Sequence, residues 1–181
     1  MTSRLIVVAR CVLALSLVSV PRCGVAQVGA ETEAELVAPA EITRQDTREA
    51  ICLMVESAAK AENLPLEFFA RVIWQESRFQ SDAVGPMTRS GQRAQGIAQF
   101  MPGTADERRL LDPFDPVQAL PKSAEFLSEL REQFGNLGLA AAAYNAGPRR
   151  VQDWLDNKGS IPSETRDYVL AITGTPIDDW A

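Results

Sequence analysis

Beyond residue 46, apolar residues recur at intervals of three and four, the spacing of one buried face of an α-helix. The first such segment begins near Asp46, and Glu49 three residues later gives it a capping-box-like start. Its apolar or small face comprises Ile51, Met54, Val55 and Ala58. No window alternates apolar and polar residues with the period of two that marks a half-buried strand. The pattern therefore predicts an all-α fold.

Proline and glycine indicate where the further helices begin and end. Leu64-Pro65 begins a second helix, and the polar stretch 81–96, which contains three glycines, is expected to be a loop. A short helical segment is expected within 96–105, and Pro102 should interrupt it. The remaining helices are expected at 115–134, at 137–145, at 151–157, and from 163 or 164 to about 174. The chain should thus contain about six or seven short helices.

The first 26 residues follow a different pattern. Arg4 and Arg10 flank apolar residues, an uninterrupted apolar run fills 11–20, and Gly24-Val25-Ala26 provides small residues before a cleavage point. These features are typical of a secretory signal peptide, 1–26, that is cut after Ala26. A retained membrane anchor is the alternative, but a membrane span needs roughly 20 apolar residues, more than this run offers.

The rest of the chain divides into three parts. Residues 27–45 are rich in alanine and glutamate and contain no aromatic residue, so we expect a flexible linker there. The helical pattern places the folded domain at 46–174 and leaves a C-terminal tail at 175–181.

The composition excludes several kinds of chemistry. The 181 residues include no histidine, which excludes Ser-His-Asp and Cys-His catalysis and any metal site that needs imidazole. The formal net charge of −6 at pH 7 disfavours nucleic-acid binding. Cys11, Cys23 and Cys52 form no zinc pattern. Cleavage after Ala26 would leave only Cys52, which we expect to be a buried, inert thiol because it lies in an apolar helical stretch.

Glu76 is the first candidate for chemistry. It shares a helical face with Phe69, Val72 and Ile73, so its carboxylate should lose hydration. It also lies near the end of its helix, where the helix dipole disfavours an anion. Both effects raise the pKa, and a carboxyl that stays protonated near neutral pH can act as a general acid. In the alternative interpretation, Glu76 ends its helix and points into solvent.

Four segments resemble the motifs of one enzyme family, and they occur in that family's order. Trp74–Phe79 is similar to its E-S-x-F signature, 96–104 to G-x-x-Q-x-M-P-x-T, Ala143–Gly147 to A-Y-N-A-G, and Glu164–Val169 to E-T-R-x-Y-V. The family is that of the soluble lytic transglycosylases, lysozyme-like enzymes that cleave peptidoglycan. The four motifs span nearly the whole predicted domain.

This resemblance implies a lysozyme-like fold around a saccharide cleft and a single catalytic residue, Glu76. It would protonate the glycosidic oxygen between N-acetylmuramic acid (MurNAc) and N-acetylglucosamine (GlcNAc). It would then act as base on the muramic C6 hydroxyl, which attacks its own anomeric carbon and leaves a 1,6-anhydro sugar. No metal and no cofactor is implied, because one carboxyl group and the substrate's own hydroxyl suffice.

The resemblance also implies five residues that support the site, each with a local alternative. The amides of Gln99 and Asn145 would recognise N-acetyl groups and sugar hydroxyls, or else cap loop and helix ends. Tyr144 would place its hydroxyl against Glu76 and help to set its protonation, or pack as a core aromatic. Ser77 would contact sugar or peptide, or simply end its helix. Glu164 would lie near the cleft, or merely occupy the favourable first turn of its helix.

Asp82 and an insertion leave two further questions. Ordinary glycosidases use two carboxylates, and Asp82 would make the protein a hydrolytic lysozyme if it positioned a water; we interpret it as a polar loop residue. Residues 84–93 form an insertion relative to the family's usual spacing. Arg78, Arg89 and Arg93 lie on or beside it, and they either bind the carboxylates of peptide stems or belong to an ordinary solvated loop.

We therefore expect an exported enzyme of a Gram-negative periplasm that acts as a monomer on peptidoglycan glycan strands and has no nucleic-acid partner. The rival interpretations are a hydrolytic lysozyme and a non-catalytic protein for glycan binding or secretion assembly. The enzyme could in addition open the wall locally for a secretion or conjugation apparatus.

Overall fold

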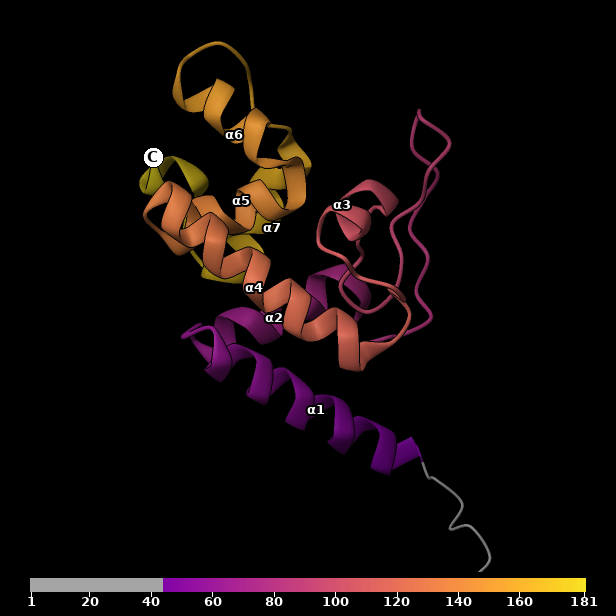
Figure 1. Ribbon diagram of the computed structural model, residues 1–181. Coiled ribbons are helices and arrows are strands. Elements are labelled where there is room, and N and C mark those ends of the chain that lie inside the picture. The colour runs from indigo at the N-terminus through magenta and orange to yellow at the C-terminus, as the bar shows by residue number, and fades with distance from the viewer. Residues whose placement is uncertain (1–43) are drawn as a thin grey trace, which may run out of the picture. The chain divides into compact units, whose positions relative to one another are not determined.

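The computed structural model describes residues 44–181, so the expected signal peptide and most of the expected linker lie outside the described part. In chain order the helices are α1 (Arg44–Ala61), α2 (Leu66–Ser77), α3 (Pro102–Glu107), α4 (Pro116–Phe134), α5 (Leu137–Ala146), α6 (Pro148–Leu155), α7 (Ser163–Thr173) and the 3₁₀-helix η1 (Ile177–Trp180) (Figure 1). Apart from isolated β-bridges, residues 44–181 contain no β-structure and no strand, which confirms the predicted all-α fold. No helix in this part is long and apolar enough to cross a membrane.

Helix α5 forms the centre of the packing, against α4, α6, α7 and η1 (Figure 1). Residues 139–143 are all buried, and four of these five are alanines, whose small side chains let the neighbouring helices approach closely. Gly138 is needed for the same reason, because a Cβ there would lie 2.2 Å from the ring of Trp180. The segment expected to be a C-terminal tail therefore contains a short helix that packs onto α5.

Helix α1 packs against α2 and α4 through a narrow apolar face. Ile51, Val55, Ala58 and Ala59 are buried on this face. Cys52 is exposed, so the expectation of a buried thiol is wrong. The physical reason is helical geometry: the next residue lies about 100° around the helix, which takes Cys52 off the face that Ile51 buries.

Several helix starts differ from those expected. Helix α2 begins at Leu66, and Pro65 precedes it as the N-cap. Helix α1 begins at Arg44 rather than near Asp46. Pro102 begins α3 instead of interrupting a segment, and Pro148 begins α6 before the expected 151. Proline lacks an N–H and has a fixed φ, so it suits the first position of a helix, where no backbone acceptor is needed.

The stretch expected to be a loop contains an irregular hairpin, residues 83–96, which extends beside α3 (Figure 1). Two backbone hydrogen bonds hold its base: Gly85 N donates to Ala94 O at 2.9 Å, and Gly96 N donates to Ala83 O at 2.8 Å. Gly96 has φ +74°, and a Cβ there would lie 1.7 Å from the carbonyl oxygen of Pro113. Only glycine fits both the conformation and the space at this position.

Candidate active site

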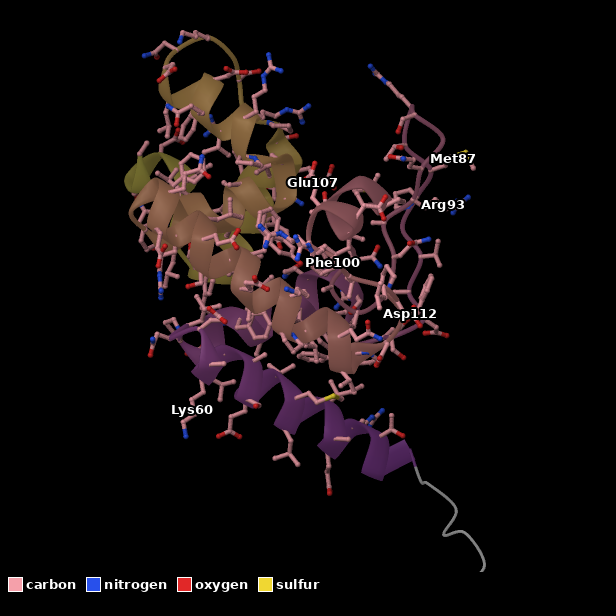
Figure 2. The ribbon with its side chains drawn as sticks, in the orientation of Figure 1. Lys60, Met87, Arg93, Phe100, Glu107 and Asp112 are labelled. Carbon is pink, nitrogen blue, oxygen red and sulfur yellow. The ribbon has the colours of Figure 1, made fainter. Side chains whose placement is uncertain are left out.

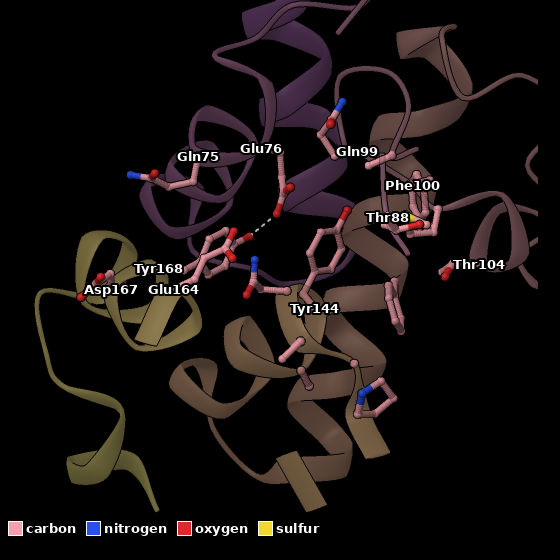
Figure 3. A pocket seen from close by; sticks show the side chains of 18 of the residues that line it. Gln75, Glu76, Thr88, Gln99, Phe100, Thr104, Tyr144, Glu164, Asp167 and Tyr168 are labelled. Carbon is pink, nitrogen blue, oxygen red and sulfur yellow. Dashed lines mark hydrogen bonds between the residues drawn. The ribbon is translucent and has the colours of Figure 1, made fainter. Parts of the chain in front are cut away.

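A cleft of about 1010 Å³ runs between the hairpin and the ends of α2, α5 and α7. Figure 3 shows the side chains that line it, with Glu76 between Gln99 on one side and Tyr168 and Glu164 on the other. Residues from all four sequence motifs meet here, although the motifs are far apart in the chain.

Glu76 lies at the end of α2, directly after a buried stretch. Phe69, Val72 and Ile73 on its helical face are fully buried, as their spacing predicted. Glu76 itself is only partly exposed and lines the cleft. Its Oε1 accepts a hydrogen bond of 2.5 Å from the hydroxyl of Tyr168, which Figure 3 marks. Its Oε2 has no hydrogen-bond partner among the described residues and is free to meet a ligand.

The carboxyl of Glu76 is an unusually weak acid, mainly because it is buried. The loss of hydration raises the pKa of this carboxyl to about 7. The hydrogen bond from Tyr168 opposes this increase in pKa because it stabilises the anion, whereas the negative charge of Glu164 adds to it. A carboxyl with such a pKa exists in both protonation states near neutral pH, so it can donate a proton and take one back.

Tyr168 is a site residue that the sequence analysis did not select. It belongs to the fourth motif, which was the available signal, but its contact with Glu76 joins residues 92 positions apart. Burial and the charge of Glu76 raise the pKa of Tyr168 well above its usual value, so its hydroxyl stays protonated and remains a donor.

Tyr144 lines the cleft, but its hydroxyl does not hydrogen-bond to Glu76, and this corrects the expected contact. The hydroxyl donates to Ala98 O at 2.9 Å and therefore accepts from Ser123 Oγ, also at 2.9 Å. Burial and the nearby charge of Glu76 raise the pKa of Tyr144 far above its usual value. Tyr144 thus joins α5 to α4 and to the segment before α3, next to the acid (Figure 3).

Ser77 does not line the cleft, so the expected contact with sugar or peptide is corrected as well. The residue is buried, and its hydroxyl donates to Ile97 O at 2.7 Å. The chain turns sharply after it, since Arg78 and Phe79 both have positive φ. Ser77 therefore ties the end of α2, and with it Glu76, to the second motif.

Gln99 lines the cleft, but its amide nitrogen is already occupied. Nε2 donates to Ala83 O at 3.1 Å and to Gly96 O at 2.8 Å, which are the two ends of the hairpin. An amide N–H₂ has only two hydrogens, so little donor capacity remains for a ligand. Gln99 holds the hairpin wall in place.

Asn145 and Glu164 both lie at the cleft, on exposed positions. The Oδ1 atom of Asn145 accepts a hydrogen bond of 2.8 Å from Thr165, which leaves its N–H₂ group as a donor toward the cleft. Asp167 also lines the cleft, and sequence reasoning missed it. Asp82 is exposed and lies outside the cleft lining, as expected for a loop residue.

The chain is similar to known transglycosylases. The transglycosylase SLT domain family matches residues 54–166. The soluble lytic murein transglycosylase of Salmonella typhimurium is 38% identical over 115 residues, which are 51% of this chain and 18% of that protein. The transglycosylase of Enterobacteria phage PRD1 is 28% identical over 120 residues, 66% of this chain and 43% of that protein.

Solved structures show the same similarity. The structure of an inactive glutamate-to-glutamine mutant of lytic transglycosylase Slt from Pseudomonas aeruginosa has a TM-score of 0.55 at 31% identity and covers 73% of this chain and 23% of that chain. The 70-kDa soluble lytic transglycosylase of Escherichia coli has a TM-score of 0.57 at 27% identity, over 77% of this chain and 24% of that chain. This chain thus spans less than a quarter of the length of these bacterial relatives.

Proposed function

The chain belongs to the transglycosylase SLT domain family, and we propose that it cleaves peptidoglycan as a lytic transglycosylase. The proposed reaction breaks the β-1,4 bond between MurNAc and GlcNAc without water and leaves 1,6-anhydro-MurNAc ends. The observation that carries this proposal is Glu76, a carboxyl with a pKa of about 7 that has one free oxygen in a large cleft.

Glu76 acts twice in the proposed reaction. The protonated carboxyl first donates its proton to the glycosidic oxygen, and the bond from that oxygen to the muramic C1 breaks. The resulting carboxylate then takes the proton of the muramic C6 hydroxyl while this oxygen bonds to C1, so Glu76 ends in its starting state. Tyr168 stabilises the intermediate carboxylate by its hydrogen bond to Oε1. General acid–base catalysis of this kind contributes about 10²- to 10⁴-fold in rate.

A hydrolytic mechanism would need a carboxylate other than the one that the sequence offered. An inverting or retaining glycosidase needs a second carboxylate about 5 to 9.5 Å from the first. Asp82, the expected candidate, lies outside the cleft lining. The other carboxylates of the cleft are Glu164 and Asp167, on exposed positions of α7, and the hydrolytic alternative would have to use one of them.

Product masses test the proposal directly. Residues 27–181, wild type and Glu76→Gln, are incubated with purified peptidoglycan, and the released fragments are analysed by mass spectrometry. We expect anhydro-muropeptides from the wild type and about 10²- to 10⁴-fold less product from the variant. Products heavier by one water would identify a lysozyme, and equal digestion by both proteins would refute the assignment of Glu76.

We further propose that the enzyme acts in the periplasm after export. The support is the N-terminal sequence pattern together with relatives named as murein transglycosylases. Fractionation of cells and mass analysis of the mature N-terminus would test export and cleavage after Ala26. Recovery of secretion or conjugation components in a pull-down would test the suggested recruitment by such an apparatus.

A further inference from the structure

A second hollow continues from the catalytic cleft around the start of α6. It measures about 570 Å³ and shares the lining residues 146–148 with the cleft. Arg149, Arg150 and Asp153 of α6 form much of its remaining surface, and Gly159 and Ser160 complete it. A ligand in the cleft therefore needs to extend only past Pro148 to reach this second hollow, which we call the α6 hollow.

The two hollows carry opposite charge. The ionisable acids in the lining of the cleft are Glu76, Glu164 and Asp167, and its lining includes no lysine or arginine. The α6 hollow is lined by two arginines and a single acid. An anionic group would therefore be repelled from the cleft and attracted to the α6 hollow, while neutral sugars would meet no such penalty in the cleft.

The two arginines are available to a ligand. The side chain of Arg149 is 95% exposed, and its only ion-pair contact among the described residues is a long one of 3.9 Å to Asp153. The exposed guanidinium of Arg150 has no side-chain partner within residues 44–181. A guanidinium offers five N–H donors in a planar fork that matches a carboxylate.

We propose that the α6 hollow binds the carboxylates of the peptide stem that projects from a glycan strand held in the cleft. This inference rests on the proposed function, since it takes peptidoglycan as the substrate. It assigns the sugars to the acid-lined cleft and the anionic peptide to Arg149 and Arg150. It also places stem recognition at α6 rather than at Arg89 and Arg93 of the hairpin, which are absent from the lining of both hollows (Figure 2 labels Arg93).

Binding measurements separate this inference from the catalytic proposal. All proteins carry Glu76→Gln, so that strands stay intact, and dissociation constants are measured for soluble glycan strands with peptide stems and for strands stripped of them by an amidase. For strands with stems, we expect Arg149→Gln/Arg150→Gln to weaken binding about three- to tenfold, as two exposed ion pairs allow. The effect should shrink at high salt, and binding of stripped strands should stay unchanged.

Two matched variants serve as controls. Arg48→Gln/Lys60→Gln removes the same charge from exposed positions on α1, outside both hollows, and should leave binding unchanged. Arg89→Gln/Arg93→Gln tests the rival location on the hairpin. The proposal is overturned if the α6 variant binds both kinds of strand equally less, because the contact would then lie on the sugars, or if only the hairpin variant loses stem-dependent binding. If the variants bind strands in this way but the chain with Glu76 intact releases no anhydro product, only the catalytic proposal is contradicted.

Discussion

The two walls of the cleft contribute differently to the site. The wall made by α2 and α7 places Tyr168 and Glu164 around Glu76, so its contribution is electrostatic. The opposite wall is the hairpin, which is held by its own backbone hydrogen bonds and by the amide of Gln99, and which contributes shape. Rigid helices can tune the pKa of a buried acid because they hold its neighbours at fixed distances, whereas a loop can do so only after other groups have fixed it.

The largest effect should come from crowding the base of the hairpin. Gly96→Ala would place a Cβ 1.7 Å from Pro113 O at a residue with φ +74°, whereas Gly91→Ala meets nothing within 4 Å at φ +77°. We expect Gly96→Ala to lower the free energy of unfolding by about 2 to 4 kcal/mol, and Gly91→Ala by about 1 kcal/mol. Urea denaturation measures both. Equal losses would show that the backbone conformation, rather than the contact with Pro113, requires glycine at position 96.

A second prediction concerns the cost of the buried acid. The pKa of Glu76 is raised from 4.5 to about 7 on folding, so its contribution to stability is fully present below pH 4.5 and is lost as pH rises through 7. Glutamine does not ionise, so the stability of Glu76→Gln should not fall over this pH range for the same reason. We expect the variant to gain about 1 to 3 kcal/mol over the wild type between about pH 4 and about pH 8. A difference between the two proteins that does not change with pH would show that Glu76 is not desolvated.

The helical wall should shift the pH profile of cleavage in two directions. Tyr168→Phe removes a hydrogen bond that lowers the pKa of Glu76, so the loss of activity with rising pH should move to higher pH. Glu164→Gln removes a charge that raises this pKa, so the same limb should move to lower pH. The measurement is kcat/KM on soluble glycan strands as a function of pH. Shifts of both variants in one direction would contradict the assigned roles.

The smallest effect should come from removing the two hydrogen bonds by which Gln99 holds the base of the hairpin. Gln99→Ala removes two hydrogen bonds to backbone carbonyls and should cost about 1 to 2 kcal/mol of stability. Because the residue acts through the wall, KM should rise more than kcat falls. Gln92→Ala, on the same hairpin, is the control, since its side chain makes no hydrogen bond among the described residues and is exposed. A loss confined to kcat would instead place Gln99 at the reacting atoms.

The sequence predicted the helices well where local signals mark their ends. Asp115 caps α4 by accepting from Val117 N, and Gly135 and Gly174 end α4 and α7 with positive φ. These are interactions within one turn, so a local pattern contains them. The sequence was less informative where one residue type can take two structural roles. A proline can begin or interrupt a helix, and Pro102 begins the helix that it was expected to interrupt. A cysteine in an apolar helix can be buried or exposed, and Cys52 lies just off the buried face of α1.

Three expected site residues, Ser77, Gln99 and Tyr144, have hydrogen-bond partners at distant positions of the chain, which no local pattern shows. Ser77 and Gln99 belong to the expected motifs, yet their side chains bind backbone carbonyls at positions 97, 83 and 96 instead of pointing freely into the cleft. The hydroxyl expected from Tyr144 at Glu76 comes from Tyr168. The motifs identify which residues gather at the site, but they do not say which side chain takes which hydrogen bond.

The sequence alone determined the helical class, the family and the position of Glu76 on an apolar face, because each depends on spacing over a few residues or on short motifs. Tertiary structure decided the acidity of that residue and the charge around it. Burial, the hydroxyl of Tyr168 and the charge of Glu164 affect Glu76 only after helices from distant parts of the chain pack together. Electrostatic effects depend on distance through space, so those between residues far apart in the sequence become strong only when folding brings them together.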